Sequence, residues 1–179
     1  MTEFFDVLDE WGNKTGKTKA RTDVHRDGDW HKAVHIWIVN DKDEILLQRR
    51  SPNKDSYPNM WDISSAGHLT AGDNSLSGAV REIKEELGVD VPASQLILIG
   101  VRKSMSRPSA TFINNEFNDV YLLRQSLDLN KVVLQEEEVS EVKYIPISEF
   151  RNMIKKRDKT LLMHDDEFEM LFNALGYLL

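Results

Sequence analysis

Cysteine is absent from the 179-residue chain. Without a thiol, the protein has no disulfide bonds, no thiolate metal site and no cysteine nucleophile. The first ten residues are acidic and lack the basic start and apolar core of a secretory signal. We therefore expect a cytoplasmic protein.

Long apolar runs and an excess of positive charge are also missing. The longest uncharged apolar stretches, 33–39 and 96–101, have the length of a strand and are too short to span a bilayer. The formal net charge of −7 repels a long polyphosphate such as DNA or RNA. A small phosphorylated ligand stays possible, because a bound divalent cation reverses the local field. We expect neither a membrane nor a nucleic acid polymer as partner.

The hydrophobic pattern predicts strands before and after a central helix. Period-two and short apolar runs predict strands, and apolar residues at helical spacing predict helices. The predicted strands are 33–39, 44–48, 61–65, 95–104, 116–124 and 141–145, and the predicted helices are 74–87, 148–156 and 165–175. Strands before and after a helix, with short connections, indicate an α/β domain built on a mixed sheet. Because strands and helices do not alternate regularly, we do not expect a doubly wound or barrel fold. Residues 1–179 form one domain in this interpretation, with an N-terminal hairpin extension at 1–30.

The central helix has two chemically different faces. Its apolar residues share one side, while three glutamates fall within an arc of about 100° on the other. Asp73, Asn74 or Ser75 is expected to cap the helix, and Gly88 suits its left-handed C-terminal position. The apolar residues are Leu76, Ala79, Val80, Ile83 and Leu87, and the glutamates are Glu82, Glu85 and Glu86. By itself this pattern describes a solvated acidic face as well as a set of oxygen ligands for Mg²⁺ or Mn²⁺.

The residues around these glutamates favour a metal site. From Gly67, five residues lead to Asp73, and seven more lead to Arg81-Glu-Ile-Lys-Glu-Glu-Leu-Gly-Val89. This arrangement over 67–89 resembles the signature of the Nudix hydrolases, a loop, a helix and a loop, with Asp73 in place of the first glutamate.

The resemblance implies the Nudix fold, a mixed sheet sandwiched between helices (α/β/α), and hydrolysis of a diphosphate linkage in a small molecule. Glu82, Glu85, Glu86 and the carbonyl of Gly67 would hold Mg²⁺, or Mn²⁺ in its place. Glu82 or Glu85 would also orient or deprotonate the attacking water, and Arg81 would hold the loop by pairing with Asp73. Since Nudix proteins often supply one more acid from a later strand, Glu116 is a further expected ligand. The resemblance also allows for a homodimer, which no residue of the chain demonstrates.

The flanking residues resemble the isopentenyl-diphosphate isomerases, which share the Nudix fold. Those enzymes have a second metal site of histidines and glutamates, to which His25, His31, His68 and Glu116 correspond here, with Asn114 replacing one glutamate. They carry their catalytic cysteine where this chain has Ala66. A methyl group cannot exchange a proton with an allylic carbon. The resemblance is therefore to the isomerase-like Nudix hydrolases, and isomerase activity is not expected.

Several side chains have a structural and a functional interpretation. Arg49 and Arg50 follow an apolar strand and could bind substrate phosphate or form surface ion pairs. His31 and His35 alternate with apolar residues, as half-buried strand residues do. His25 lies in a predicted polar loop. His164 is expected at the surface, and Trp30, Trp37 and Trp61 in the core.

Three functions stay open from sequence. The first is Mg²⁺-dependent hydrolysis of a nucleoside or other organic diphosphate. The second is isomerisation of a prenyl diphosphate. The third is a non-catalytic module that senses a diphosphate ligand, for which Asp73 is the only support. The group attached to the diphosphate cannot be read from the signature.

Overall fold

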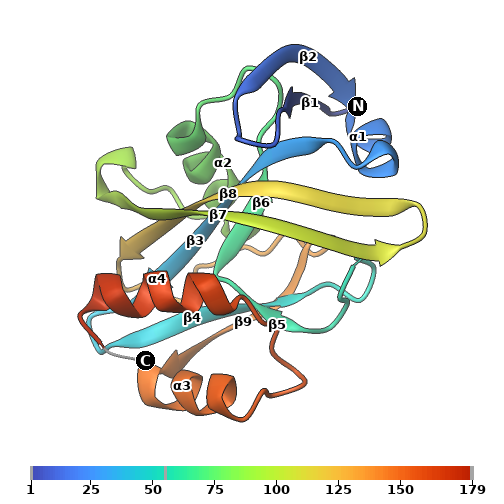
Figure 1. The fold of residues 1–179 in the computed structure, drawn as a ribbon. Coiled ribbons are helices and arrows are strands. Elements are labelled where there is room, and N and C mark those ends of the chain that lie inside the picture. The colour runs from blue at the N-terminus through green and yellow to red at the C-terminus, as the bar shows by residue number, and fades with distance from the viewer. Residues whose placement is uncertain (1, 55, 178–179) are drawn as a thin grey trace.

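The computed structural model describes residues 2–54 and 56–177, and within them one mixed sheet of nine strands dominates (Figure 1). The strands are β1 (Phe4–Leu8), β2 (Lys14–Ala20), β3 (Trp30–Val39), β4 (Glu44–Arg50), β5 (Trp61–Asp62), β6 (Ser65–His68), β7 (Leu96–Ser109), β8 (Phe112–Arg124) and β9 (Val139–Pro146). The helices are α1 (Arg21–Asp27), α2 (Ser75–Leu87), α3 (Ile147–Lys155) and α4 (Asp165–Leu175), with a short 3-10 turn η1 (Ala93–Gln95).

Strand β3 organises the sheet. One edge pairs in parallel with β8 along its whole length, from Trp30 with Asn115 to Val39 with Arg124. The other edge pairs antiparallel with β1, β6 and β4 in turn. Among the described strands, β6 pairs with β3 alone, so its outer edge has backbone groups free for other partners. This free edge lies at the functional site.

Two hydrophobic cores lie on opposite faces of the sheet. Val34, Ile36 and Ile38 of β3 pack with the apolar face of α2, because alternate residues of a strand point to the same side. Trp37 and Val39 point the other way and pack with α3 and α4. The sheet therefore lies between helices, with α2 across it from α3 and α4 (Figure 1), and the predicted α/β/α architecture is confirmed.

Helix α2 begins and ends where the sequence predicts. The side chain of Asn74 accepts a hydrogen bond from the Leu76 amide at 3.0 Å, which caps the N-terminus. Gly88 ends the helix with φ of 69°, and a Cβ there would crowd Val133. The helix thus presents a fixed set of side chains to β6.

Three local expectations were wrong. Residues 21–27, predicted as part of a hairpin and a polar loop, form α1; the helix is short and its N-cap Ala20 offers no side-chain cap. The strand predicted at 61–65 is two strands, β5 and β6, which pair with β4 and β3 respectively. Strands β7 and β8 extend beyond the predicted 95–104 and 116–124 into a long hairpin. None of the helices described in the chain is long and apolar enough to cross a membrane.

Candidate functional site

Gly67 allows α2 to approach β6 closely. A Cβ at position 67 would overlap the carboxyl group of Glu82, so no larger residue fits without displacing that side chain. Glycine and glutamate are thus parts of one close contact between strand and helix. Both line a cavity of about 530 Å³, together with Glu85 and Glu86.

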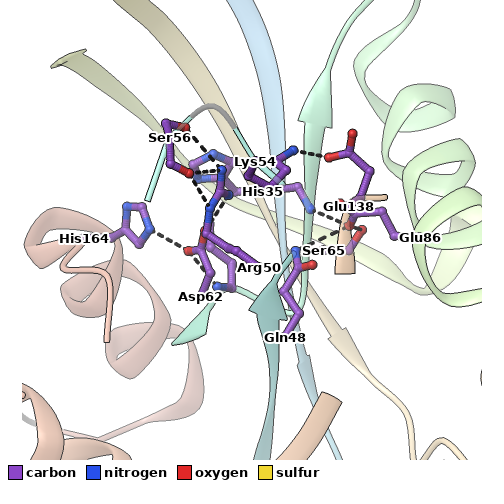
Figure 2. A network of polar contacts seen from close by, with 12 residues as sticks. His35, Gln48, Arg50, Lys54, Ser56, Asp62, Ser65, Glu86, Glu138 and His164 are labelled. Atoms are coloured by element: carbon purple, nitrogen blue, oxygen red, sulfur yellow. Dashed lines mark hydrogen bonds and ion pairs between the residues drawn. The ribbon is translucent and has the colours of Figure 1, made fainter. Parts of the chain in front are cut away.

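Glu86 lies against the free edge of β6. Its Oε2 accepts hydrogen bonds from the hydroxyl of Ser65 at 2.6 Å and the amide of Ala66 at 3.0 Å, with the Gln48 amide at 3.4 Å (Figure 2). The carboxylate is buried, and burial raises its pKa to about 8, with a smaller contribution from the charge of Glu82. A bound cation would offset the free energy that it costs to bury the charged carboxylate.

Glu82 is the second buried carboxylate of α2. Burial raises its pKa to about 7, although the charge of Arg81 opposes the shift. Glu85, by contrast, is about half exposed. The alternative interpretation of a solvated acidic face is therefore wrong for Glu82 and Glu86, because α2 packs this face against β6.

Arg81 joins the glutamates to the loop before the helix. Its guanidinium lies 2.7 Å from Glu82 and 2.9 Å from Glu85, and it donates to the His68 carbonyl at 3.0 Å. It also reaches Asp73 at 3.4 Å.

Asp73 itself closes the preceding turn, since the amide and hydroxyl of Thr70 donate to its Oδ2 at 3.1 Å and 2.6 Å. The shorter acid therefore keeps its contact with Arg81.

Three histidines from three elements lie close together. His25 of α1, His31 of β3 and His68 of β6 place their potential ligand atoms within 4.8 Å of one another. Their rings surround Phe5, on which His31 and His68 stack. His25 is almost fully buried, so its expected position in a solvated loop was wrong. We call these residues the three-histidine group.

The nitrogen atoms of this group suit a metal ion. The Nε2 atoms of His25 and His31 are buried and have no hydrogen-bond partner among the described residues. Their Nδ1 atoms face backbone carbonyls, of Ile113 at 3.4 Å and Asp29 at 3.0 Å, the arrangement that orients metal-bound imidazoles. Burial lowers the pKa of His25 to about 4, with the charges of His68 and His31 adding to the shift, so its ring is neutral at pH 7.

Glu116 of β8 lies beside the three-histidine group. Its Oε1 is 3.0 Å from Nε2 of His68 and 3.7 Å from Nε2 of His31. Burial raises the pKa of Glu116, but the two histidines outweigh this effect and hold it well below its usual range. The structure thus places Glu116 with the histidines, and no described contact joins it to the glutamates of α2. Asn114, two residues before Glu116 on β8, lines the same cavity as Glu116 and the α2 glutamates.

Sequence reasoning missed a buried polar network opposite the glutamates. Asp62 accepts from Arg50 at 3.0 Å and is 2.9 Å from His164 (Figure 2). Arg102 lies 2.9 Å from the other nitrogen of His164 and 3.4 Å from Glu167. His164, expected at the surface, is therefore buried, because the segment before α4 packs against β5. No local pattern marks these residues, since their partners lie far apart in the chain.

The two arginines after β4 have different surroundings. Arg49 is partly exposed and pairs with Glu141 at 3.5 Å, outside the cavity. Arg50 lines the cavity but is held by Asp62 and by the carbonyl and hydroxyl of Ser56. Of the predicted core tryptophans, Trp37 is fully buried, whereas Trp30 and Trp61 are half-buried.

Together, the fold and the site define a class of protein: a helix rich in glutamate, packed by a glycine against the edge of a mixed α/β/α sheet. The model of the NUDIX domain matches residues 29–164. The chain belongs to the Nudix family, and the predicted resemblance is confirmed.

Similar proteins include Nudix hydrolases and isopentenyl-diphosphate isomerases. The chain is 49% identical to Nudix hydrolase 3 of Arabidopsis thaliana over 180 residues, covering 97% of this chain and 23% of that protein. The chain thus spans less than a quarter of that relative. It is 34% identical to an isopentenyl-diphosphate Delta-isomerase of Paenarthrobacter aurescens over 130 residues, covering 72% of this chain and 70% of that one.

The fold recurs in solved structures. That of DR0079 from Deinococcus radiodurans has a TM-score of 0.68 at 20% identity, covering 94% of this chain and 98% of that one. At this identity the likeness concerns the fold.

Proposed function

We propose that the protein hydrolyses the diphosphate linkage of a small organic diphosphate with the help of a divalent cation. The observation that carries this proposal is the pair of buried carboxylates, Glu82 and Glu86, held by α2 at the free edge of β6 and facing a cavity. When charged, buried carboxylates need a counter-charge close by; Arg81 supplies one to Glu82, and no ion pair among the described residues supplies one to Glu86. Membership of the Nudix family and the similarity to Nudix hydrolases support the reaction class.

The residues of this site take distinct roles in the proposal. Glu82, Glu85, Glu86 and the Gly67 carbonyl supply the oxygen ligands that Mg²⁺ or Mn²⁺ prefers. When bound, such an ion neutralises diphosphate charge and lowers the pKa of a water molecule. Glu85 is the most accessible of the three acids and is suited to orient the attacking water, with Glu82 as the alternative. Arg81 holds Glu82, Glu85 and the loop in place.

The three-histidine group with Glu116 forms a second metal site in this proposal. Two buried imidazole nitrogens that have no hydrogen-bond partner among the described residues, and a carboxylate oxygen 3.0 Å from the third histidine, support it. Imidazole ligands favour Zn²⁺ and other transition ions over Mg²⁺. His68 and Glu116 line the same cavity as the α2 glutamates, so both sites would face one substrate.

The direct test is hydrolysis of a panel of nucleoside and other organic diphosphates with Mg²⁺ or Mn²⁺. We expect turnover of at least one substrate, and we expect Glu85→Gln and Glu86→Gln each to lower kcat by about 10²-fold or more. Glu149→Gln, at an exposed position of α3, is the matched control. Full activity in both site variants would refute the proposed roles.

Isomerisation of a prenyl diphosphate is the second candidate, favoured by the three-histidine group and by the similarity to an isomerase. Ala66 opposes it, because its methyl group can neither give nor take a proton. Deuterium incorporation into isopentenyl diphosphate in heavy water would establish the isomerase, and we expect none.

A non-catalytic sensing module is the third candidate. Its only support was Asp73, which nevertheless contacts Arg81. Tight binding of a diphosphate without turnover, at saturating Mg²⁺ and Mn²⁺, would favour the module. The expected partner is a small-molecule diphosphate, while a homodimer and a cytoplasmic location stay predictions.

A further inference from the structure

A chain of buried hydrogen bonds runs from Glu116 to helix α4. Asn118 of β8 donates one amide hydrogen to Oε2 of Glu116 at 3.0 Å and the other to Nε2 of His35 at 3.2 Å. His35 contacts Oε1 of Glu167 through Nδ1 at 2.6 Å. Glu116, Asn118, His35 and Glu167 are all buried.

For a neutral His35 ring, the donors and acceptors in this chain allow one consistent assignment. The hydroxyl of Ser104 donates to Oδ1 of Asn118 at 2.9 Å, which fixes the orientation of the amide. Both hydrogens of the Asn118 amide then point at Glu116 and His35, so Nε2 of His35 accepts. The imidazole proton is therefore on Nδ1, where Glu167 accepts it. Glu167 thus selects the tautomer of His35 that the Asn118 amide requires.

The two oxygens of Glu116 have separate partners as a result. Oε2 is held by Asn118, while Oε1 lies toward the three-histidine group, 3.0 Å from His68. Partners of this kind orient the ligands of a metal and are a common determinant of its affinity. Fold stability explains the arrangement poorly, because a buried pair such as His35 and Glu167 contributes little net stability compared with apolar residues of similar size.

We propose that Glu167, His35 and Asn118 form a positioning relay that fixes the Glu116 carboxylate toward the three-histidine group and so raises the metal affinity of that group. The relay rests on the three-histidine group as a metal site, as proposed above. None of its members lies in the 67–89 signature. It makes α4, at the far end of the chain, part of the machinery of a metal site that starts on α1.

The test measures metal affinity instead of activity. The metal-free full chain is titrated with Co²⁺, followed by visible absorption, and the part of the signal lost in His31→Gln is assigned to the three-histidine group. We expect Asn118→Leu and Glu167→Met to weaken this His31-dependent affinity by about 10- to 100-fold. Glu167→Gln, which keeps an oxygen acceptor for Nδ1 of His35, is expected to stay within about threefold of the wild type.

Two controls make the outcome decisive. Glu169→Met changes an exposed glutamate on the same helix and is expected to bind Co²⁺ as the wild type does. Thermal melting of each metal-free variant identifies any that fail to fold, in which case a second relay-breaking variant, Asn118→Ala, replaces it.

A wild-type Co²⁺ affinity in folded Asn118→Leu and Glu167→Met would overturn the relay and leave the metal site standing. A wild type without any His31-dependent signal would overturn the three-histidine site and the relay together. Hydrolysis of the diphosphate panel, which depends on the α2 glutamates, is measured separately and is not decided by either result.

Discussion

At the scale of single residues, the site depends on close approach and on burial. Position 67 requires glycine, because the Glu82 carboxyl occupies the space that a Cβ would need. Glu86 is held by a hydroxyl and a backbone amide of the neighbouring strand. The signature spacing predicted that these residues act together. It could not predict that two of the glutamates are buried, because their burial depends on how α2 packs on β6.

The buried glutamates predict an unusual dependence of stability on pH. The pKa of Glu86 rises from 4.5 to about 8 on folding, so the folded protein binds this proton more tightly than the unfolded chain does. The contribution of Glu86 to the stability of the metal-free protein should therefore be lost as the pH rises from about 4.5 to about 8. Glu86→Gln should flatten this profile and give a higher Tm than the wild type at pH 8. For a chain of this size, each kcal/mol gained in the free energy of unfolding raises the Tm by about 2–4 °C.

Thermal melting from pH 4.5 to 8.5 in the presence of a chelator measures both profiles. Glu149→Gln is the control, because this side chain lies exposed on α3. A Glu86→Gln profile with the same pH dependence as the wild type would contradict the prediction.

Histidines show where prediction from sequence fails at this scale. His25 was expected in a solvated loop and His164 at the surface, yet both are buried. Each is placed by residues far away in the chain: His25 by Ile113 and the other histidines, His164 by Asp62 and Arg102. A local pattern contains no information about such partners.

At the scale of elements, prediction succeeded where local chemistry decides the structure. Helix α2 has a capping side chain at Asn74, a glycine at Gly88 and a clear apolar stripe, and its bounds were predicted almost to the residue. Helix α1 has no side chain capping its start and was missed. The break between β5 and β6 was missed because it depends on two different partner strands, β4 and β3.

Asn74 offers a test at this scale. Asn74→Ala removes the acceptor of the Leu76 amide and should destabilise the protein by about 1 kcal/mol. This corresponds to a loss in Tm of roughly 2–4 °C for a chain of this size. Asn74→Asp keeps an acceptor and should melt close to the wild type in the same calorimetric scans. An equal loss in both variants would assign the effect to something other than the cap.

At the scale of the whole molecule, the sheet gathers remote segments around one cavity. The mixed sheet between helices and the family were predicted from the order of elements and from one 23-residue stretch. The buried polar network opposite the glutamates was not predicted, because contacts such as that of His35 with Glu167 join residues 132 positions apart. Such contacts require knowledge of the full topology.

Divalent cations should stabilise the whole protein in a pH-dependent way. Mg²⁺ at a concentration of about 100 times its Kd at pH 8.5 should raise the free energy of unfolding at that pH by about 2.7 kcal/mol, and the same concentration is used at pH 6. The gain should be larger at pH 8.5 than at pH 6, because protons compete with the cation for Glu82 and Glu86, whose pKa values are raised to about 7 and about 8. Differential scanning calorimetry at both pH values, with chelator as the control, measures this. An equal gain at the two pH values would argue that the cation binds elsewhere.

His25 and Glu167 both lie outside the stretch of the chain that matches the NUDIX domain. The NUDIX match covers residues 29–164, so it includes the glutamates but neither His25 on α1 nor Glu167 on α4. From outside the shared domain, Glu3 and Arg21 line the same cavity, and Glu167 contacts the cavity residue His35. Substitutions in these flanks should therefore change the proposed second metal site while the proposed diphosphate chemistry is preserved. The terminal segments are where relatives with the same signature should be compared first when their substrates differ.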